Sequence, residues 1–341
     1  MMIREVLEQF LNGQDLSHDQ MVEAMRMIMG GSVPPELIAG FLVGLQFKGY
    51  TVTEMTAAAE VMRELSLKVE VVDREKLVDT CGTGGDGTKT FNISTAASFV
   101  VAAAGGRVAK HGGRSVSSSS GSADVLEALG ARIDLEPEQV SECLNEVGVG
   151  FMFAPSHHSA MKHAAPVRKA LGVKTLFNVL GPLTNPAGAK RQVMGVYDSA
   201  LLVKQAQVLQ KLGSSRAMIV CGDDGLDEIS PSGVTHVAEL QEGRISEYTV
   251  CVEDFGLAPV DLLSLRVDDV EQAVKMLSDS LSGEFEQGKT ALSLNAGAAL
   301  YVLGFRESLR ESVGLARSVI ESGAALAKLE EFVEYSNAIR G

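Results

Sequence analysis

The 341-residue sequence has no tryptophan, few aromatic residues and only four cysteines. It contains no run of about 20 apolar residues, so we expect no membrane-spanning helix and no membrane partner. The N-terminal stretch MMIREVLEQFLNGQD carries charges within its apolar pattern, which is not typical of a signal peptide. The cysteines, Cys81, Cys143, Cys221 and Cys251, show neither disulfide nor metal-ligand spacing. A reducing cytoplasm is therefore the expected location.

The sequence also lacks an excess of basic residues. Lysine and arginine together number 30 against 44 acidic residues, which gives a net charge of -14. Non-specific nucleic-acid binding needs a basic surface that replaces counterions, so we expect no nucleic-acid partner. An acidic protein can still bind a phosphorylated small molecule, because backbone amides and a metal ion supply local positive charge.

The pattern of apolar residues predicts two domains. Residues 1–70 show helical spacing only, with capping boxes at Ser17 and Thr51 and a helix opened by Pro34 and Pro35. From residue 71 to 341, strand-like runs alternate with helical stretches, which is typical of a mostly parallel sheet flanked by helices. We expect an α/β fold with a small all-α domain. A helix from about residues 160–190 could join the helical domain, which would interleave the two domains.

A glycine-rich segment, residues 79–95, follows the first predicted strand and is called the glycine turn below. It reads DTCGTGGDGTKTFNIST, with glycines that allow backbone amides to approach an anion and a helix that begins near Ser94. Its spacing matches neither the dinucleotide fingerprint nor the phosphate-binding loop that ends in lysine. A plain strand-to-helix turn is the alternative. Asp86 could accept hydrogen bonds from ribose hydroxyls, and together with Asn92, Ser94 and Thr95 it favours phosphate binding.

A serine-rich loop, residues 110–122, follows the next predicted strand. Its sequence KHGGRSVSSSSGS offers two cations, Lys110 and Arg114, and many hydroxyl donors. Ligands of alternating α/β sheets bind at the carboxyl ends of strands, so this loop could form the second wall of a diphosphate site. A flexible solvated linker is the alternative reading.

Two further features gain a role only from the resemblance described next. Asp227 and Glu228 follow a predicted strand and could hold a hydrated Mg²⁺, although without the resemblance a solvated acidic turn is the preferred reading. Arg168 has a planar guanidinium that suits a carboxylate, although a surface helix arginine is the commoner case. We assign no catalytic role to His157, His158 or His163, and we expect no catalytic dyad.

The two loops together closely resemble the anthranilate phosphoribosyltransferase family. The match continues through FMFAPSHHSAMKHAAPVRKALGVKTLFNVLGPLTNP and GLDEISPSG, and it covers nearly the whole chain. The resemblance implies a fold like those of nucleoside phosphorylases and phosphoribosyltransferases, and a homodimer formed through the helical domain. It implies transfer of a phosphoribosyl group from phosphoribosyl pyrophosphate, the donor, to anthranilate, the acceptor. It also implies Mg²⁺ as cofactor.

The resemblance assigns roles to individual residues. For the donor these are Gly82, Gly85, Asp86, Thr90, Asn92, Ile93, Ser94, Thr95, Lys110, His111, Gly112, Gly113, Arg114, Ser115, Val116, Ser117, Ser118 and Ser122. For the acceptor they are Gly82, His111, Gly113, Arg168, Gly181 and Pro182, and for the metal Ser94, Asp227 and Glu228. The family normally has asparagine where this chain has Gly113, which puts acceptor binding in doubt and leaves the donor site untouched.

Two alternatives remain at this stage. A pyrimidine nucleoside phosphorylase shares the two-domain architecture, but the adjacent Asp227–Glu228 pair and the Asn-Ile-Ser-Thr sequence favour the transferase. A non-catalytic relative that binds nucleic acid would show basic patches and degenerate phosphate loops. The intact loops and the net charge of -14 argue against it.

Overall fold

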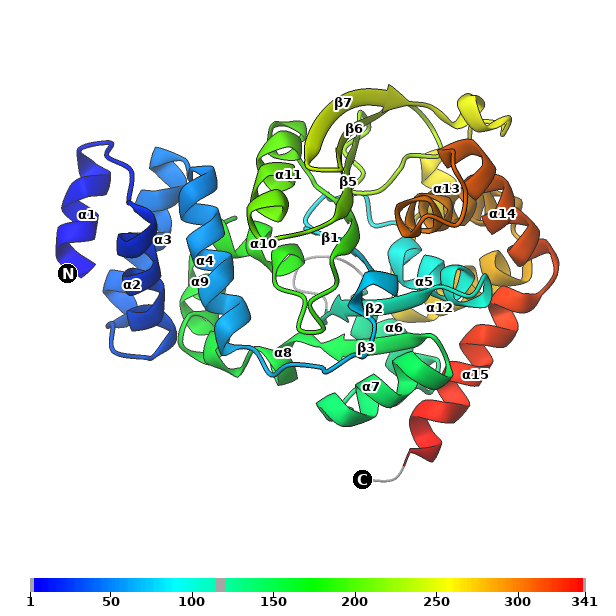
Figure 1. Ribbon diagram of the computed structural model, residues 1–341, viewed down its shortest axis with the longest axis horizontal. Helices are drawn as coiled ribbons and strands as arrows, with labels where there is room; N and C mark the ends of the chain where they lie inside the picture. The colour runs from blue at the N-terminus through cyan, green and yellow to red at the C-terminus, as the bar shows by residue number, and fades with distance from the viewer. Residues whose placement is uncertain (1–2, 115–119, 340–341) are drawn as a thin grey trace.

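The computed structural model describes residues 3–114 and 120–339. A group of N-terminal helices lies at one end of the molecule, beside a larger part built around a central sheet (Figure 1). Among the helices formed by the described residues, none combines the length and apolar character needed to cross a membrane.

The N-terminal part contains four helices, as the sequence predicts: α1 (Ile3–Leu11), α2 (His18–Met29), α3 (Pro35–Lys48) and α4 (Val52–Leu65). Both predicted capping boxes form. The Ser17 hydroxyl accepts from the Gln20 amide at 3.3 Å, and the Thr51 hydroxyl accepts from the Glu54 amide at 3.2 Å. Such caps satisfy amide groups that the first helical turn leaves without partners, so the local sequence alone sets where these helices begin.

The second part is built on a seven-stranded sheet in the order β3-β2-β1-β4-β5-β6-β7. The strands are β1 (Leu77–Gly82), β2 (Arg107–Gly112), β3 (Val149–Phe153), β4 (Arg191–Gly195), β5 (Arg216–Gly222), β6 (Thr235–Gln241) and β7 (Arg244–Val250). Strands β1 to β5 are parallel, whereas β6 and β7 form an antiparallel hairpin at one edge. The expected mostly parallel sheet is therefore confirmed.

The strand order reverses next to β1. The chain runs outward from β1 through β2 to β3, then returns to place β4 on the other side of β1. In open α/β sheets, ligands bind outside the carboxyl ends of the strands at such a reversal. Gly82, at the end of β1, lies at this point beside Gly195 of β4.

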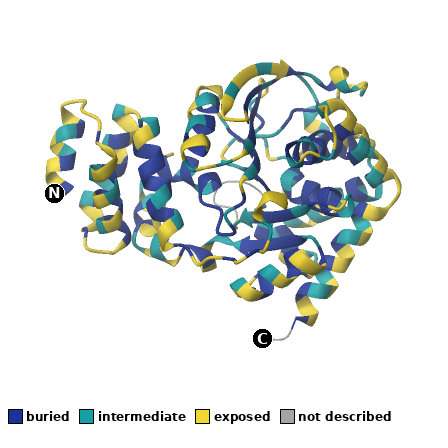
Figure 2. Cartoon of the chain, in the orientation of Figure 1, coloured by how far each residue is buried: buried dark blue, intermediate teal, exposed yellow. Residues whose placement is uncertain are grey.

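Helices cover both faces of the sheet. They are α5 (Ile93–Ala103), α6 (Ser122–Ala128), α7 (Pro137–Glu146), α11 (Leu202–Lys211), α12 (Val270–Ser282), α13 (Glu286–Leu303), α14 (Leu309–Glu321) and α15 (Ala324–Ala338). Helix α13 packs against α5 and against β1, β4 and β5. It is buried along most of its length, and Figure 2 shows the central strands buried as well. This helix therefore sits in the core directly behind the reversal point.

The segment of residues 160–190, called the connecting segment, contains α9 (Ala165–Leu171), α10 (Leu176–Leu180) and the short turn η3 (Gly181–Leu183). Helix α9 packs on α3, and α10 packs on α3 and α4. Its apolar side chains share one buried cluster with α1 to α4. These contacts support the interleaved arrangement, while the domain limits of 1–70 and 71–341 stay a prediction.

Candidate functional site

The glycine turn links the end of β1 to the start of α5, at the reversal point of the sheet. Gly84, Gly85 and Gly87 have φ values of 64°, 74° and 76°, which lie in the left-handed region that glycine adopts without strain. Gly84 and Gly85 are exposed. Asp86 accepts a hydrogen bond from the Thr88 hydroxyl. The turn therefore places exposed glycine backbone next to the positive end of α5, a position that favours an anion.

The serine-rich loop lies against the glycine turn. The Asn92 amide donates to the Ser120 carbonyl at 3.2 Å, and the Ser120 hydroxyl donates to the Asn92 side-chain oxygen at 3.0 Å. Ser122 begins α6 so close to β2 that a Cβ on Gly112 would come within 2.1 Å of the Ser122 hydroxyl. The two strand-end loops thus form adjoining walls, as predicted, and Gly112 is needed for their close approach.

Four residues of the serine-rich loop that were predicted to bind the donor lie outside the described residues. They are Ser115, Val116, Ser117 and Ser118. Arg114, which precedes them, is exposed and pairs with carboxylates of α6. Its guanidinium donates to Glu127 at 2.8 Å and 3.0 Å, and to Asp124 at 3.0 Å. Its predicted role in donor binding would require these ion pairs to be shared or exchanged.

Lys110 lies beneath the site rather than at its surface. The side chain is only 3% exposed, and its ammonium donates to the Thr80 carbonyl at 2.7 Å and to the Ser94 hydroxyl at 3.2 Å. Burial lowers the pKa of Lys110, while the negative charges of nearby carboxylates, Asp79 foremost, oppose the shift. In this position Lys110 orients the Ser94 hydroxyl and supplies a cation behind the two turns.

The acidic turn, residues 223–230, follows β5 and reaches across the sheet to the glycine turn. Asp227 accepts from the Gly84 amide at 2.8 Å, and Glu228 accepts from the Ser94 amide at 3.1 Å. Both side chains are half-buried. Burial and the neighbouring carboxylate charges raise the pKa of both acids. A bound cation would relieve this unfavourable burial of negative charge, which is what a metal site offers.

The chemistry of these side chains fits Mg²⁺. The described residues contain no group of three or more histidine, cysteine, aspartate or glutamate side chains that could together hold a metal. Mg²⁺ needs no such cage, because it usually binds one or two carboxylates and keeps water and substrate phosphate as further ligands. Asp227, Glu228 and the Ser94 hydroxyl provide such a set of hard oxygen donors.

Two strand-end glycines make room for the acidic turn. A Cβ on Gly82 would lie 2.3 Å from the Asp227 carboxylate, and one on Gly195 would lie 1.5 Å from the Asp227 carbonyl oxygen. No side chain fits at either position without displacing Asp227. Gly195 is not among the predicted site residues, because nothing in a single sequence shows that a distant turn passes over the end of β4.

On the acceptor side, the structure brings His111 together with the turn at Gly181. Burial lowers the pKa of His111 well below its usual value, and a hydrogen bond with the Gly181 backbone opposes the shift. His158, to which we assigned no catalytic role from the sequence, packs against it in a tilted arrangement with ring centroids 4.9 Å apart. Burial lowers the pKa of His158 to about 4, so the two rings form a neutral pair at pH 7. The Nε2 atoms of both rings are buried without hydrogen-bond partners.

Arg168 and Gly113 occupy more open positions. The Arg168 guanidinium lies over the Phe177 ring at 5.4 Å, and burial alone lowers its pKa, with no acidic group opposing the shift. It is therefore a half-buried cation without a carboxylate partner in the described part of the chain. A Cβ on Gly113 would meet only the Ala154 methyl group, at 3.9 Å. Within the described residues, no hydrogen bond joins Arg168 to Gly113 or His111.

Lys174 also lies at the site, although it is not among the predicted site residues. It belongs to the connecting segment, and its ammonium lies 3.3 Å from the centroid of the Tyr197 ring. A Cβ on Gly85 would come within 3.3 Å of the Lys174 side chain. This lysine therefore reaches from the connecting segment to the glycine turn, a contact that no local pattern signals.

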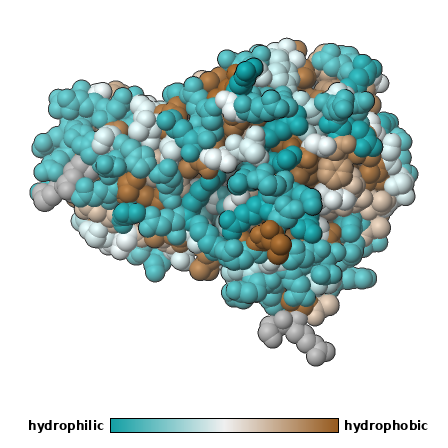
Figure 3. All heavy atoms as spheres, in the orientation of Figure 1, coloured by the Kyte–Doolittle hydropathy of each residue, from teal (hydrophilic) through white to brown (hydrophobic). Residues whose placement is uncertain are grey.

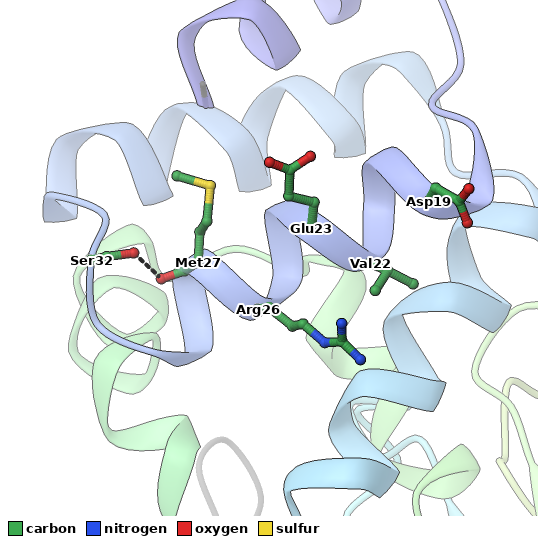
Figure 4. A pocket seen from close by; sticks show the side chains of 6 residues that line it. All are labelled: Asp19, Val22, Glu23, Arg26, Met27 and Ser32. Carbon is green, nitrogen blue, oxygen red and sulfur yellow. Dashed lines mark hydrogen bonds between the residues drawn. The ribbon is translucent and has the colours of Figure 1, made fainter. Parts of the chain in front are cut away.

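Two surface pockets can be compared with this arrangement. The larger is lined by Asp19, Val22, Glu23, Arg26, Met27 and Ser32 on and just after α2 (Figure 4). Helix α2 lies away from the central sheet (Figure 1). The smaller lies between the glycine turn and residues 262–266, and Asp86 and Asp224 line it. Only the smaller pocket adjoins the phosphate-binding features, so we place the candidate site at the strand ends.

Comparison with known proteins gives consistent matches along the chain. The glycosyl transferase family α/β-domain model matches residues 74–326, and the helical bundle domain model of the same family matches residues 4–66. Over 332 residues, the chain is 53% identical to anthranilate phosphoribosyltransferase of Methylobacillus flagellatus, covering 97% of both chains.

Solved structures agree with these matches. The anthranilate phosphoribosyltransferase of Thermus thermophilus superposes with a TM-score of 0.92 at 41% identity, covering 97% of this chain and 99% of that one. The Saccharomyces cerevisiae enzyme in complex with phosphoribosyl pyrophosphate and Mg superposes with a TM-score of 0.90 at 26% identity. That match covers 99% of this chain and 98% of the yeast chain.

Proposed function

The chain belongs to the anthranilate phosphoribosyltransferase family, and on that premise we propose how its residues carry out the transfer. The reaction moves the phosphoribosyl group of phosphoribosyl pyrophosphate to the amine of anthranilate, as a step of tryptophan biosynthesis. It yields N-(5-phosphoribosyl)anthranilate and pyrophosphate. The observation that carries the residue assignment is the meeting of the glycine turn, serine-rich loop and acidic turn at one reversal point. The hydrogen bonds of Gly84 to Asp227 and of Asn92 to Ser120 join these segments.

Donor binding is proposed for the residues of the glycine turn and the serine-rich loop. Breaking the bond to the anomeric carbon leaves positive charge on the ribose and negative charge on the diphosphate. Exposed amides of the glycine turn, the positive end of α5 and the serine hydroxyls bind the anionic groups. Asp86 accepts hydrogen bonds from ribose hydroxyls. When bound by Asp227, Glu228 and Ser94, Mg²⁺ supplies further positive charge to the leaving group.

Acceptor binding is proposed for Arg168, His111 and the turn at Gly181 and Pro182. Among the described residues the Arg168 guanidinium has no acidic partner to displace, so it can take the anthranilate carboxylate. An aromatic amine is already neutral at pH 7 and attacks without a strong general base. Holding this amine against the anomeric carbon is therefore the main task of the acceptor side.

A homodimer formed through the helical part is proposed as well. Phe47 of α3 and Leu11 of α1 are 93% and 87% exposed, and Val43 lies one helical turn from Phe47. The face drawn in Figure 3 is mostly hydrophilic, with separate apolar patches. Exposed apolar side chains at one end of the molecule fit contact with a second copy. Phe47→Glu should then yield monomers in light scattering, whereas Val72→Glu, at a 96% exposed site elsewhere, should leave the mass unchanged.

The chain also fits a cytoplasmic enzyme, since Cys81, Cys143 and Cys221 are buried free thiols. One experiment tests the proposed activity. Purified protein, donor, Mg²⁺ and anthranilate are mixed, and the loss of anthranilate fluorescence is followed. We expect loss only when donor and Mg²⁺ are both present. Phosphorolysis of thymidine by the same preparation would contradict the proposal.

A further inference from the structure

One buried polar side chain behind the site has no role in the reaction as described so far. Asn295 lies in the middle of α13, in the apolar stretch LSLNAGAAL, and is 2% exposed. A buried amide is unfavourable unless all its polar atoms are paired, so its partners indicate why it is tolerated there.

The partners of Asn295 lie at the end of the acidic turn. Its side-chain oxygen accepts from the Ile229 amide at 2.8 Å, and its side-chain amide donates to the Ile229 carbonyl at 3.1 Å. The same amide donates to the Ala291 carbonyl of its own helix at 3.0 Å. Ile229 directly follows Glu228. One side chain thus holds both backbone polar groups of the residue next to the acidic pair.

The contacts of Asp224 and Gly195 also support the acidic turn, but they do not bind the Ile229 backbone as Asn295 does. Asp224 accepts from the Leu226 amide at 3.1 Å and from the Ser230 hydroxyl at 2.6 Å, which closes the turn on itself. On its far side the turn passes over Gly195, where no side chain fits. Of these contacts, only that of Asn295 ties the Ile229 backbone to another element of the core.

Helix α13 also contacts the other half of the metal site. It packs against α5, whose first turn carries Ser94, and against β1 and β4, whose ends carry Gly82 and Gly195. The distance between Ser94 and the acidic pair depends on the hydrogen bond from the Ser94 amide to Glu228 and on where the packing of α13 holds α5 and the acidic turn. The hydrogen bonds of Asn295 to Ile229 attach the acidic turn to α13.

We propose that Asn295 is a positioning residue that attaches the acidic turn to α13 and so sets Asp227 and Glu228 at the spacing needed to bind Mg²⁺ with the donor diphosphate. The inference rests on the proposed metal role of that pair. Replacing a residue that orients metal ligands typically lowers metal affinity or activity 10- to 100-fold. Asn295 acts in this way through the backbone of Ile229.

The test measures metal binding directly. Mn²⁺ replaces Mg²⁺ as the probe, and its binding to the full-length protein with pyrophosphate present is titrated by electron paramagnetic resonance. Asn295→Leu removes all three hydrogen bonds at similar side-chain size. We expect Mn²⁺ to bind roughly 10-fold or more weakly, in the range typical of such residues. The anthranilate Michaelis constant should stay unchanged.

The matched control is Ser293→Ala on the same helix. Ser293 is fully buried, and its hydroxyl bonds only within α13, to the Lys289 carbonyl at 2.7 Å. This variant should bind Mn²⁺ like the original protein. If Asn295→Leu lowers the melting temperature but keeps the original Mn²⁺ affinity, Asn295 is only structural and the inference is wrong. Should the leucine variant not fold, Asn295→Ala is used with the same two outcomes, since alanine suits a helix interior.

A double variant, Asp227→Ala with Glu228→Ala, separates this inference from the proposed metal site. Loss of Mn²⁺ binding in the double variant, together with original affinity in Asn295→Leu, would refute the positioning role alone. Original affinity in the double variant would refute the metal site itself and the inference with it. Weakened Mn²⁺ binding in the double variant and in Asn295→Leu supports the metal site and the positioning role of Asn295.

Discussion

The donor side and the acceptor side of the site differ in how tightly their residues are held. On the donor side, Asp227 and Glu228 accept hydrogen bonds from the glycine turn and α5, and glycines at strand ends leave no spare room. On the acceptor side, within the part of the chain that the structure describes, Arg168 rests on Phe177 without an acidic partner, and a Cβ on Gly113 would meet only one methyl group. The donor side tolerates little change, whereas the acceptor side leaves space for substitution.

This difference follows from where each side is attached. The donor residues lie at the carboxyl ends of strands in the central sheet, and their backbone is fixed by β1, β4 and α13. Half of the proposed acceptor residues, Arg168, Gly181 and Pro182, come from the connecting segment, which packs on the N-terminal helices. Chemistry that must neutralise a diphosphate needs rigid preorganised groups, because they act without reorganising during the reaction. Recognition of a small aromatic acid can vary with a few side chains.

The largest effect should come from the acidic pair. Replacing Asp227 and Glu228 together with alanine should lower Mg²⁺-dependent turnover on the order of 10²- to 10³-fold, because metal stabilisation of a leaving group amounts to several kcal/mol. The rate is measured while Mg²⁺ is raised to saturation. Asp223→Ala is the control, since Asp223 is exposed and pairs with His236 at 2.6 Å. Unchanged rates in the double variant at saturating Mg²⁺ would rule out the metal assignment.

The next effect concerns the acceptor alone. Arg168→Ala should raise the anthranilate Michaelis constant about 10- to 100-fold, because a hydrogen bond to a charged group contributes roughly 1.5–3 kcal/mol. The donor constant should change much less, since Arg168 lies in the connecting segment. Steady-state kinetics with each substrate varied in turn provide the comparison, and Lys169→Ala on the same helix serves as the control. Equal rises in both constants would count against separate donor and acceptor sides.

Packing at the strand ends offers a smaller, structural test. Gly195→Ala would place a methyl group 1.5 Å from the Asp227 carbonyl oxygen, so β4 or the acidic turn must move. We expect a loss of about 1–3 kcal/mol in the free energy of unfolding, as in other overpacked sites. Gly113→Ala should leave stability nearly unchanged, because its methyl group has only an ordinary contact. If chemical denaturation gave equal losses in the free energy of unfolding for Gly195→Ala and Gly113→Ala, the donor side would not be more tightly packed than the acceptor side.

The smallest effect is expected at the position where this chain departs from its family. Gly113→Asn restores the usual residue, and the open space at this position admits the side chain. One added hydrogen bond contributes about 0.5–1.5 kcal/mol, so the anthranilate constant should fall roughly 2- to 10-fold. An anthranilate titration at saturating donor measures it. No improvement would show that residue 113 does not contact the acceptor in this chain.

Much of the fold could be predicted from local patterns. The capping boxes at Ser17 and Thr51 and the alternation of strands and helices after residue 71 are confirmed. Each depends on residues close together in the chain, whose backbone preferences act locally. The joining of the glycine turn to the serine-rich loop also followed from the rule that ligands bind at strand ends.

Other parts of the site had no local signal. The sequence identified Lys110 as a cation of the serine-rich loop but did not show that it is buried and donates to Ser94. It likewise gave no sign that the His158 ring packs against His111. Each position depends on how distant segments pack, which a single sequence does not reveal.

By itself, the sequence determined where the strands end, where glycines allow tight turns, and that the chain is acidic without a membrane-spanning run. These properties arise from neighbouring residues and from composition. Only the tertiary structure decided that Asp227 meets Gly84 across 143 positions, and that Asn295 meets Ile229 across 66. Such contacts form because the sheet order and the packing of α13 bring remote segments together. The amino-acid type sets which hydrogen bonds these residues can make, but the packing of the fold decides which partners they bind.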